Sequence, residues 1–194
     1  MAMNEEITAY FHAVGATDVK HSSKGYLAHA MGVYRDLKRG GCDEGLAQVG
    51  IFHSIYGTEL FQGFTLPLKQ RGEVRKLVGD RPERIAWMNC AINRFQFDQE
   101  AKKSTGPYQI RDRFSSTMMD VDSNDFHDLC VVHMCDWLEQ VERSNAWNYR
   151  RTAYVNLANR LGGVAREAYQ NVFSQAPPQE WFDEYTWPDK ATDG

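Results

Sequence analysis

The sequence predicts an all-α fold built as a single helical bundle domain. Apolar residues recur at intervals of three and four along several segments, as on one face of a helix. Glycine and proline pairs close these segments, and no segment alternates apolar and polar residues as a half-buried strand does. The length of 194 residues suits one domain with a short appendage.

The first predicted helices lie at residues 23–39 and after Asp43. Ser22 and Ser23 are suitable N-cap residues, and Gly40–Gly41 is a strong stop signal. Asp43 is suited to cap the next helix, which we expect to end near Tyr56–Gly57. The apolar face of the first of these helices is formed by Leu27, Met31, Tyr34 and Leu37.

The rest of the chain is also predicted to be helical, apart from one irregular loop. Further helices are expected at 71–78, 82–97, 124–143 and 146–174, the last broken at Gly162–Gly163. Residues 98–123 are polar and predict a loop, a common form of lid or binding loop. We therefore assign residues 1–176 to the domain. Residues 177–194 form a tail whose aromatic side chains suit a protein partner or a homo-oligomer interface: Trp181, Phe182, Tyr185 and Trp187.

Composition excludes several classes of function. With 22 Lys and Arg against 26 Asp and Glu, the formal charge is −4, which argues against binding nucleic acid by broad phosphate neutralisation. No apolar run approaches the ~20 residues that cross a membrane. The acidic start MAMNEEIT is unlike a signal peptide, and four scattered cysteines fit reduced thiols. These features predict a cytoplasmic protein.

Three residues in apolar helical contexts are candidate metal ligands: His29, His53 and Asp136. A carboxylate in the apolar stretch around Asp136 has to be exposed, paired or bound to a metal, because burying it alone is expensive. Imidazole and carboxylate ligands from separate helices converge readily in a bundle. The three together predict a divalent metal site for Mn, Fe, Zn or Mg.

The segment HSSKGYLAHAMGVYRDLKRGGCDEGLAQVGIFHS resembles the start of an HD-domain protein. That superfamily is all-helical and usually holds a divalent metal with a first His, a His-Asp pair and a late Asp. By this resemblance His29 matches the first His, His53 the His of the pair, and Asp136 the late Asp. The resemblance covers residues 20–80 and 124–143, and it implies an HD-like helical domain.

Within the superfamily, KGYLAHAMGVYRDL and RGEVRKLVGD look most like the alarmone hydrolases of the RelA/SpoT type. These cleave pyrophosphate from a guanosine nucleotide with a metal, usually manganese. The chain departs from them at Ser54, which replaces the Asp of the pair, and in lacking the Glu-Asp pair downstream. Glu59 lies slightly later than those acids, and it is either a catalytic group or a helix-cap or surface carboxylate.

Other polar residues complete the predicted site. His21 lies about two helical turns before His29 and is a candidate contact to substrate or metal. Lys24, Arg71 and Arg75 are candidates for binding a phosphoryl group, and the two arginines lie one turn apart. The remaining histidines, His12, His127 and His133, are interpreted as surface or structural residues.

Three functions are consistent with these residues. The first is an HD-type phosphohydrolase that acts on a nucleotide or another phosphorylated small molecule. The second is an iron-dependent oxygenase, since some relatives of the superfamily oxidise organic substrates with iron. The third is an HD-like binding module without catalysis, which the serine at position 54 favours. The dominant chemistry of the superfamily places hydrolysis first.

Overall fold

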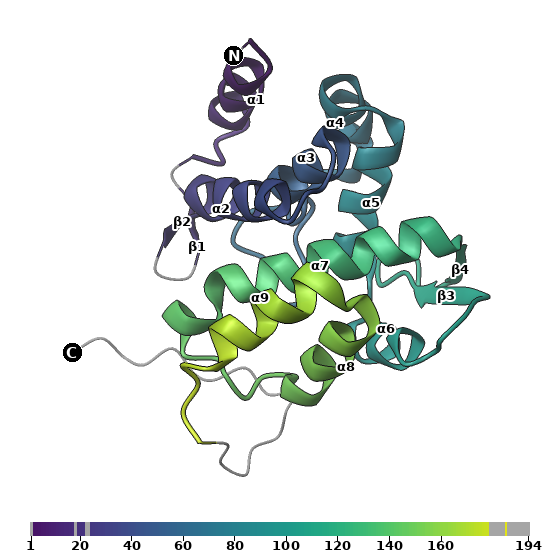
Figure 1. Cartoon of the computed structure of the whole chain (residues 1–194). Helices are drawn as coiled ribbons and strands as arrows, with labels where there is room; N and C mark the ends of the chain where they lie inside the picture. The colour runs from purple at the N-terminus through teal and green to yellow at the C-terminus, as the bar shows by residue number, and fades with distance from the viewer. Residues whose placement is uncertain (1, 18, 22–23, 179–184, 186–194) are drawn as a thin grey trace.

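The computed structural model of the chain describes residues 2–17, 19–21, 24–178 and 185, without the side chains of 2–4, 20, 21 and 24. The described part is mainly helical (Figure 1). Its α-helices are α1 Ala2–Ala13, α2 Tyr26–Arg39, α3 Glu44–Phe52, α4 Arg71–Val78, α5 Asp80–Ala91, α6 Arg94–Ala101, α7 Ser123–Ser144, α8 Arg151–Leu161 and α9 Gly163–Phe173. A short 3₁₀ helix, η1, spans Leu68–Gln70.

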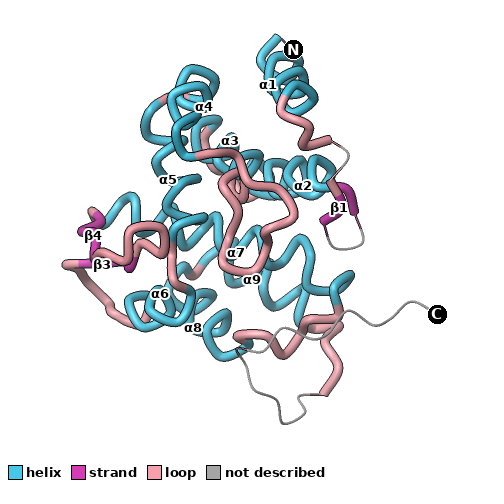
Figure 2. The backbone as a smooth tube through the Cα atoms, turned by 180° about the vertical axis from the view of Figure 1, so that it is seen from behind, coloured by secondary structure: helices cyan, strands magenta, loops and turns pink. Residues whose placement is uncertain are grey.

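The prediction of an all-α fold is confirmed only in part, because the described residues are mainly helical but include two small hairpins. Strand β1 (Lys20–His21) pairs with β2 (Lys24–Gly25), and β3 (Tyr108–Arg111) pairs antiparallel with β4 (Met118–Val121). The hairpins lie at opposite sides of the molecule in both views (Figures 1 and 2). The second lies inside the segment predicted as a loop. Its strands have only four residues, too few for a period of two to be recognised.

Several helix boundaries also differ from those predicted. The expected helix over 82–97 is two helices, because Ile92 is extended and Asn93 starts α6 by accepting a hydrogen bond from the Gln96 backbone. Helix α2 begins at Tyr26 behind Gly25, and α1 was not among the predicted helices. The expected 146–174 helix is irregular up to Arg150, then breaks at Gly162 as predicted.

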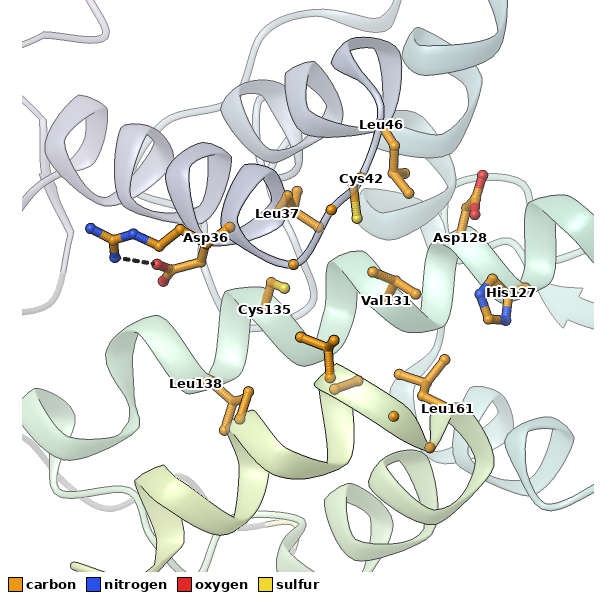
Figure 3. Close-up of a pocket in the computed structure, with 18 of the residues that line it drawn as sticks. Asp36, Leu37, Cys42, Leu46, His127, Asp128, Val131, Cys135, Leu138 and Leu161 are labelled. Atoms are coloured by element: carbon orange, nitrogen blue, oxygen red, sulfur yellow. Dashed lines mark hydrogen bonds and ion pairs between the residues drawn. The ribbon is translucent and has the colours of Figure 1, made fainter.

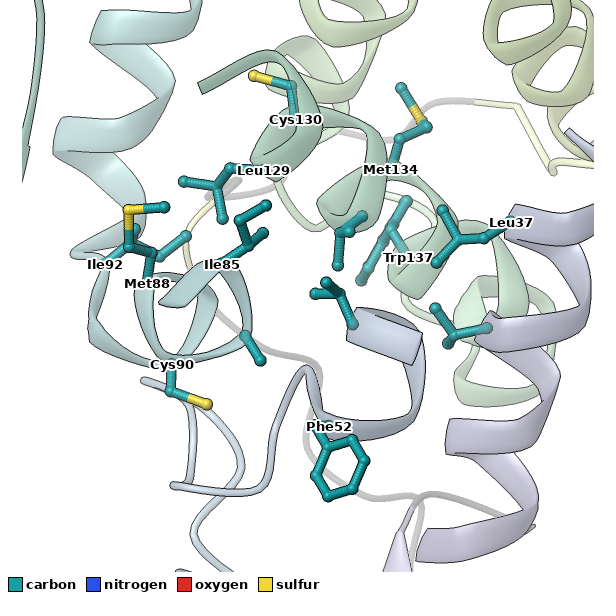
Figure 4. Close-up of a cluster of buried hydrophobic side chains, with 14 of the residues drawn as sticks. Leu37, Phe52, Ile85, Met88, Cys90, Ile92, Leu129, Cys130, Met134 and Trp137 are labelled. Atoms are coloured by element: carbon teal, nitrogen blue, oxygen red, sulfur yellow. The ribbon is translucent and has the colours of Figure 1, made fainter. Parts of the chain in front are cut away.

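Helix α7 lies at the centre of the fold. It contacts α2, α3, α5, α8 and α9 and crosses the middle of the molecule in Figure 1. Side chains from α2, α3, α5 and α7 meet in one apolar core, shown in part in Figure 4. Among its fully buried members are Leu37, Phe52, Ile85 and Leu129.

Helices α2 and α3 pack closely because Gly50 lacks a side chain. A Cβ built on Gly50 would lie 2.8 Å from Leu37 Cδ1 and 2.9 Å from the backbone nitrogen of Tyr34. This close approach brings the end of α3 against the middle of α2, so that His53 and His29 can meet. None of the described helices is long and apolar enough to cross a membrane.

Candidate metal centre

His29, His53 and Asp136 come together in the core, as the sequence predicts. His29 lies on α2, His53 follows the last residue of α3, and Asp136 lies on α7. His29 Nε2 is 3.3 Å from His53 Nε2 and 3.1 Å from Asp136 Oδ1, and His53 Nε2 is 3.3 Å from the same oxygen. The three residues are buried, with exposed fractions of 0%, 1% and 6%.

The second nitrogen of each imidazole is fixed by a hydrogen bond. His29 Nδ1 donates to Glu139 Oε2 at 2.5 Å, and His53 Nδ1 donates to the Gly50 carbonyl at 2.7 Å. With Nδ1 as the donor, the neutral imidazole presents Nε2 as an acceptor. Both acceptors therefore point at the oxygen of Asp136, and three electron-pair donors face one point.

This donor set fits a divalent metal ion. Two ligand atoms that each lie about 2.0–2.1 Å from one ion are about 2.8–3.4 Å apart, the shorter separations in octahedral and the longer in tetrahedral coordination. The three observed separations of 3.1–3.3 Å fall in this range. The Glu139–His29 contact is also the outer-shell arrangement usual for a metal-bound histidine.

The pKa values of His29 and Asp136 show that the cluster favours a bound proton in the metal-free protein. Burial alone would lower the pKa of His29, but the hydrogen bonds with Asp136 and Glu139 outweigh it and raise the pKa to about 9. Burial would raise the pKa of Asp136, yet His53 and His29 hold it well below its usual value. A cation at this point, whether a proton or a metal ion, is therefore stabilised by the surrounding groups.

Two residues that support the cluster were missed by the sequence analysis. Glu139 bonds His29, and Gln140 Nε2 donates to Asp136 Oδ1 at 2.8 Å. They follow Asp136 by three and four residues, a spacing that places all three on one side of α7. That spacing was the signal in the sequence that could have identified Glu139 and Gln140. The spacing did not indicate that Glu139 contacts His29 on the distant helix α2.

Ser54 lies beside the cluster without joining its three ligand atoms. Its side chain is buried, and Oγ donates to the Tyr26 hydroxyl at 3.4 Å. The Tyr26 ring stacks on Phe61 and packs against Phe64, with ring centroids 5.5 and 5.9 Å apart. Ser54, where the resemblance to HD domains would place an Asp, therefore contacts the hydroxyl of a tyrosine whose ring belongs to an aromatic cluster.

Glu59 is placed at the start of α6. Its carboxylate accepts hydrogen bonds from Asn93 Nδ2 at 3.0 Å and from the Arg94 backbone at 2.9 Å, and its side chain is exposed. Of the two roles considered from the sequence, this contact matches the helix-cap carboxylate. Glu59 is not among the three clustered ligands.

Arg71 and Arg75 do form a clamp, but the anion between them belongs to the chain. Arg71 Nε lies 2.6 Å from Glu83 Oε1, and Arg75 Nε lies 3.0 Å from Glu83 Oε2. Glu83 is fully buried and also accepts from the Tyr56 hydroxyl at 2.9 Å. This arrangement offers no support for the predicted role of the two arginines in binding a phosphoryl group.

The other predicted residues are placed as follows. His21 and Lys24 pair through their backbones in the β1–β2 hairpin that precedes α2, and their side chains lie outside those described. His133 is structural, as interpreted: it is buried and contacts Asn89 Oδ1 at 3.2 Å and Arg150 Nη1 at 2.8 Å. His12 and His127 are exposed.

Of the predicted aromatic tail, only Tyr185 lies within the described residues. Its hydroxyl donates to Asp98 Oδ2 at 2.9 Å, and its ring packs against Phe95 with centroids 5.4 Å apart. Trp181, Phe182 and Trp187 are outside the described part, so the predicted interface is not tested by them.

A pocket of about 640 Å³ lies on another face of α7 (Figure 3). It is enclosed by the end of α2, by α7 and by α9, and its wall is mostly apolar. Cys135 and Leu138 project into it from α7, on either side of the position of Asp136. None of the three clustered ligands lines this pocket.

Comparison with known proteins is limited to one family model. Residues 10–94 match a family described as a domain of unknown function (DUF6817). The match includes His29 and His53 and ends before Asp136. Neither the comparison with curated proteins nor that with solved structures finds a match.

Proposed function

We propose that the protein is a metal-dependent phosphohydrolase on an HD-like scaffold, acting on a nucleotide or another phosphorylated small molecule. The observation that carries the proposal is the convergence of His29 Nε2, His53 Nε2 and Asp136 Oδ1 within 3.1–3.3 Å of one another. The order of these ligands along the chain and their origin near three different helices also match the HD pattern. Fold resemblance alone would not carry the function.

The three residues would hold a single ion of Mn, Fe, Zn or Mg, since Ser54 gives no carboxylate for a second one. When bound, such an ion polarises a phosphoryl oxygen and lowers the pKa of a bound water. The chain supplies the orientation of the ligands. Glu139 and the Gly50 carbonyl fix the two imidazole tautomers, and Gln140 holds the Asp136 carboxylate.

The test is release of inorganic phosphate from a panel of nucleotides and sugar phosphates by the metal-loaded protein. We expect turnover that chelation abolishes, that His53→Ala removes, and that His12→Ala leaves unchanged. His12 is the matched control because its side chain is exposed on α1. Metal-loaded protein that releases phosphate from no member of the panel would argue against hydrolysis.

An iron-dependent oxygenase is the second candidate, favoured by the make-up of the ligand set. Two imidazoles and one carboxylate are the ligands of many non-haem iron oxygenases. The aromatic wall formed by Tyr26, Phe61 and Phe64 beside the cluster would suit an organic substrate. Iron-loaded protein that consumes oxygen in the presence of a substrate, and releases no phosphate, would favour this candidate over hydrolysis.

A further inference from the structure

Arg94 is a buried cation whose guanidinium is not fully paired. Arg94 is only 6% exposed, and its Nε and Nη1 atoms are buried without a hydrogen-bond partner among the described residues. Within that part of the chain it forms no ion pair with a carboxylate. Burying an unpaired guanidinium is expensive, so this geometry indicates a partner other than the described residues of the chain.

The backbone around Arg94 is held firmly, so the direction of its side chain is built into the fold. Arg94 is the first residue of α6, Asn93 caps that helix, and Glu59 accepts from the Arg94 backbone nitrogen. Glu59 and the neighbouring Leu60 are exposed, with Leu60 42% accessible. The backbone of Arg94 therefore lies next to exposed residues.

A second arginine, Arg113, lies near Arg94. Arg113 lies in the same region and donates to the carbonyl oxygens of Cys90 and Gly57, which are uncharged. Burial lowers the pKa of Arg113, and Arg94 lowers it further while Glu59 raises it. Asp112 also raises the pKa of Arg113, so two guanidinium groups and two carboxylates lie in this region.

This region adjoins the metal cluster. Cys90 Sγ contacts the backbone oxygen of His53 at 3.2 Å. Cys90 is also a buried group whose pKa is affected by both Arg94 and Asp136, as are His133 and Tyr154. Burial dominates the pKa values of these groups, but the positive charge of Arg94 lowers each and the negative charge of Asp136 raises each. The three groups that lie within reach of both charges are Cys90, His133 and Tyr154.

Three other arginines near the core have carboxylate partners among the described residues, unlike Arg94. Arg150 is fully buried and pairs with Asp98, to which its Nε donates at 2.8 Å. Arg71 and Arg75 pair with Glu83. Arg94 has two buried donor atoms without a partner among the described residues, Nε and Nη1, whereas Arg143 and Arg160 each have one, Nε.

We propose that Arg94 binds an oxyanion beside the metal cluster, and that in the proposed hydrolase this oxyanion is a phosphoryl group of the substrate. Guanidinium groups bind phosphate through paired N–H donors. The assignment of a phosphoryl group rests on the proposed function. The oxyanion subsite itself does not require a metal, so it can be tested on the chelated protein.

The experiment measures thermal stabilisation of the full chain by inorganic phosphate, without metal and at constant ionic strength. A ligand of the folded state raises its melting temperature, and the concentration dependence gives the affinity. We expect wild type to be stabilised, Arg94→Gln to lose about tenfold or more in phosphate affinity, and Arg94→Lys to lose less. Arg166→Gln is the matched control, because Arg166 is exposed on α9 and should bind as wild type does.

The phosphate-binding results test the subsite, the phosphoryl assignment and the proposed function separately. Equal phosphate affinity of wild type and Arg94→Gln, or no stabilisation of wild type, would overturn the subsite. If Arg94→Gln does not fold, the comparison of wild type with Arg94→Lys replaces it, and equal affinities there would overturn the subsite as well. Stronger stabilisation by acetate than by phosphate would overturn the phosphoryl assignment. Phosphate binding by a protein that takes up no metal would contradict the proposed function and leave the subsite standing.

Discussion

His29 and Glu139 are 110 residues apart in the sequence, yet Nδ1 of the one lies 2.5 Å from Oε2 of the other. This contact joins α2 to α7 and sets which imidazole nitrogen faces Asp136 and His53. It also supplies a negative charge next to the ligand set. The proposed metal centre therefore depends on this contact in addition to its three ligands.

Glu139→Gln should weaken metal binding about 10–100-fold without removing the ligands. The amide keeps the shape of the side chain but loses the charge that holds the His29 N–H. The measurement is metal affinity by competition with a coloured chelator. Glu142→Gln, one turn along on the exposed side of α7, is the control. Equal losses of metal affinity in the two variants would mean that removing any negative charge from this part of α7 has the same effect.

Gly32→Ala should disturb the same contact from the other side. A Cβ at residue 32 would lie 2.5 Å from Glu139 Oε1 and 2.9 Å from its Cγ, so Glu139 would have to move from His29. We expect a loss of metal affinity similar to that of Glu139→Gln. Gly72→Ala is the matched control, because a Cβ there meets nothing within 4 Å on α4. Unchanged affinity in Gly32→Ala would show that the contact with Glu139 is dispensable.

The chelated protein should lose stability as the pH rises from about 6.5 to about 9. The folded pKa of His29, about 9, lies above its unfolded value, so protonated His29 stabilises the fold below pH 6.5 and this contribution is lost through pH 9. The loss is on the order of 3 kcal/mol in the free energy of unfolding. The lowered pKa of His133 acts in the opposite sense, since its contribution is lost as the pH falls below about 6.5.

Urea unfolding across this pH range measures the effect. His29→Gln should flatten the profile between pH 6.5 and 9, whereas His12→Gln should keep it. A wild-type profile that is flat or rises over this range would mean that His29 is neutral in the metal-free fold.

Glu83→Gln should destabilise the fold by about 2–3 kcal/mol. The carboxylate is fully buried and receives Arg71, Arg75 and the Tyr56 hydroxyl, so neutralising it leaves two guanidinium groups without their anion. Chemical denaturation measures the change, with the exposed Glu167→Gln on α9 as control. A change below about 0.5 kcal/mol would indicate that the two arginines are held by other contacts.

The sequence was sufficient to predict a mainly helical domain and the three clustered residues. His29, His53 and Asp136 are recognisable because each is a polar residue in an apolar helical stretch. Arg71 and Arg75 show the limit of this reasoning. Their spacing predicted an anion clamp, but only the fold shows that Glu83, from the next helix, fills it.

The residues that the sequence did not reveal depend on tertiary contacts. Arg94 follows an N-cap and has the position of an ordinary first-turn residue, so its burial could not be predicted before the packing of α6 in the fold was known. The β3–β4 hairpin was missed because its strands are short. On β3, two positions carry buried apolar side chains, Tyr108 and Ile110. Short strands leave too few residues for a period to be detected.

The most direct test of the metal centre is elemental analysis of the protein purified without a His-tag or a chelator. We predict close to one equivalent of manganese, iron, zinc or magnesium in wild type and in His12→Ala. His53→Ala should lose this metal while its far-ultraviolet circular dichroism stays helical. Full metal occupancy in His53→Ala, or wild-type protein that takes up none of the four ions, would contradict the proposed metal centre.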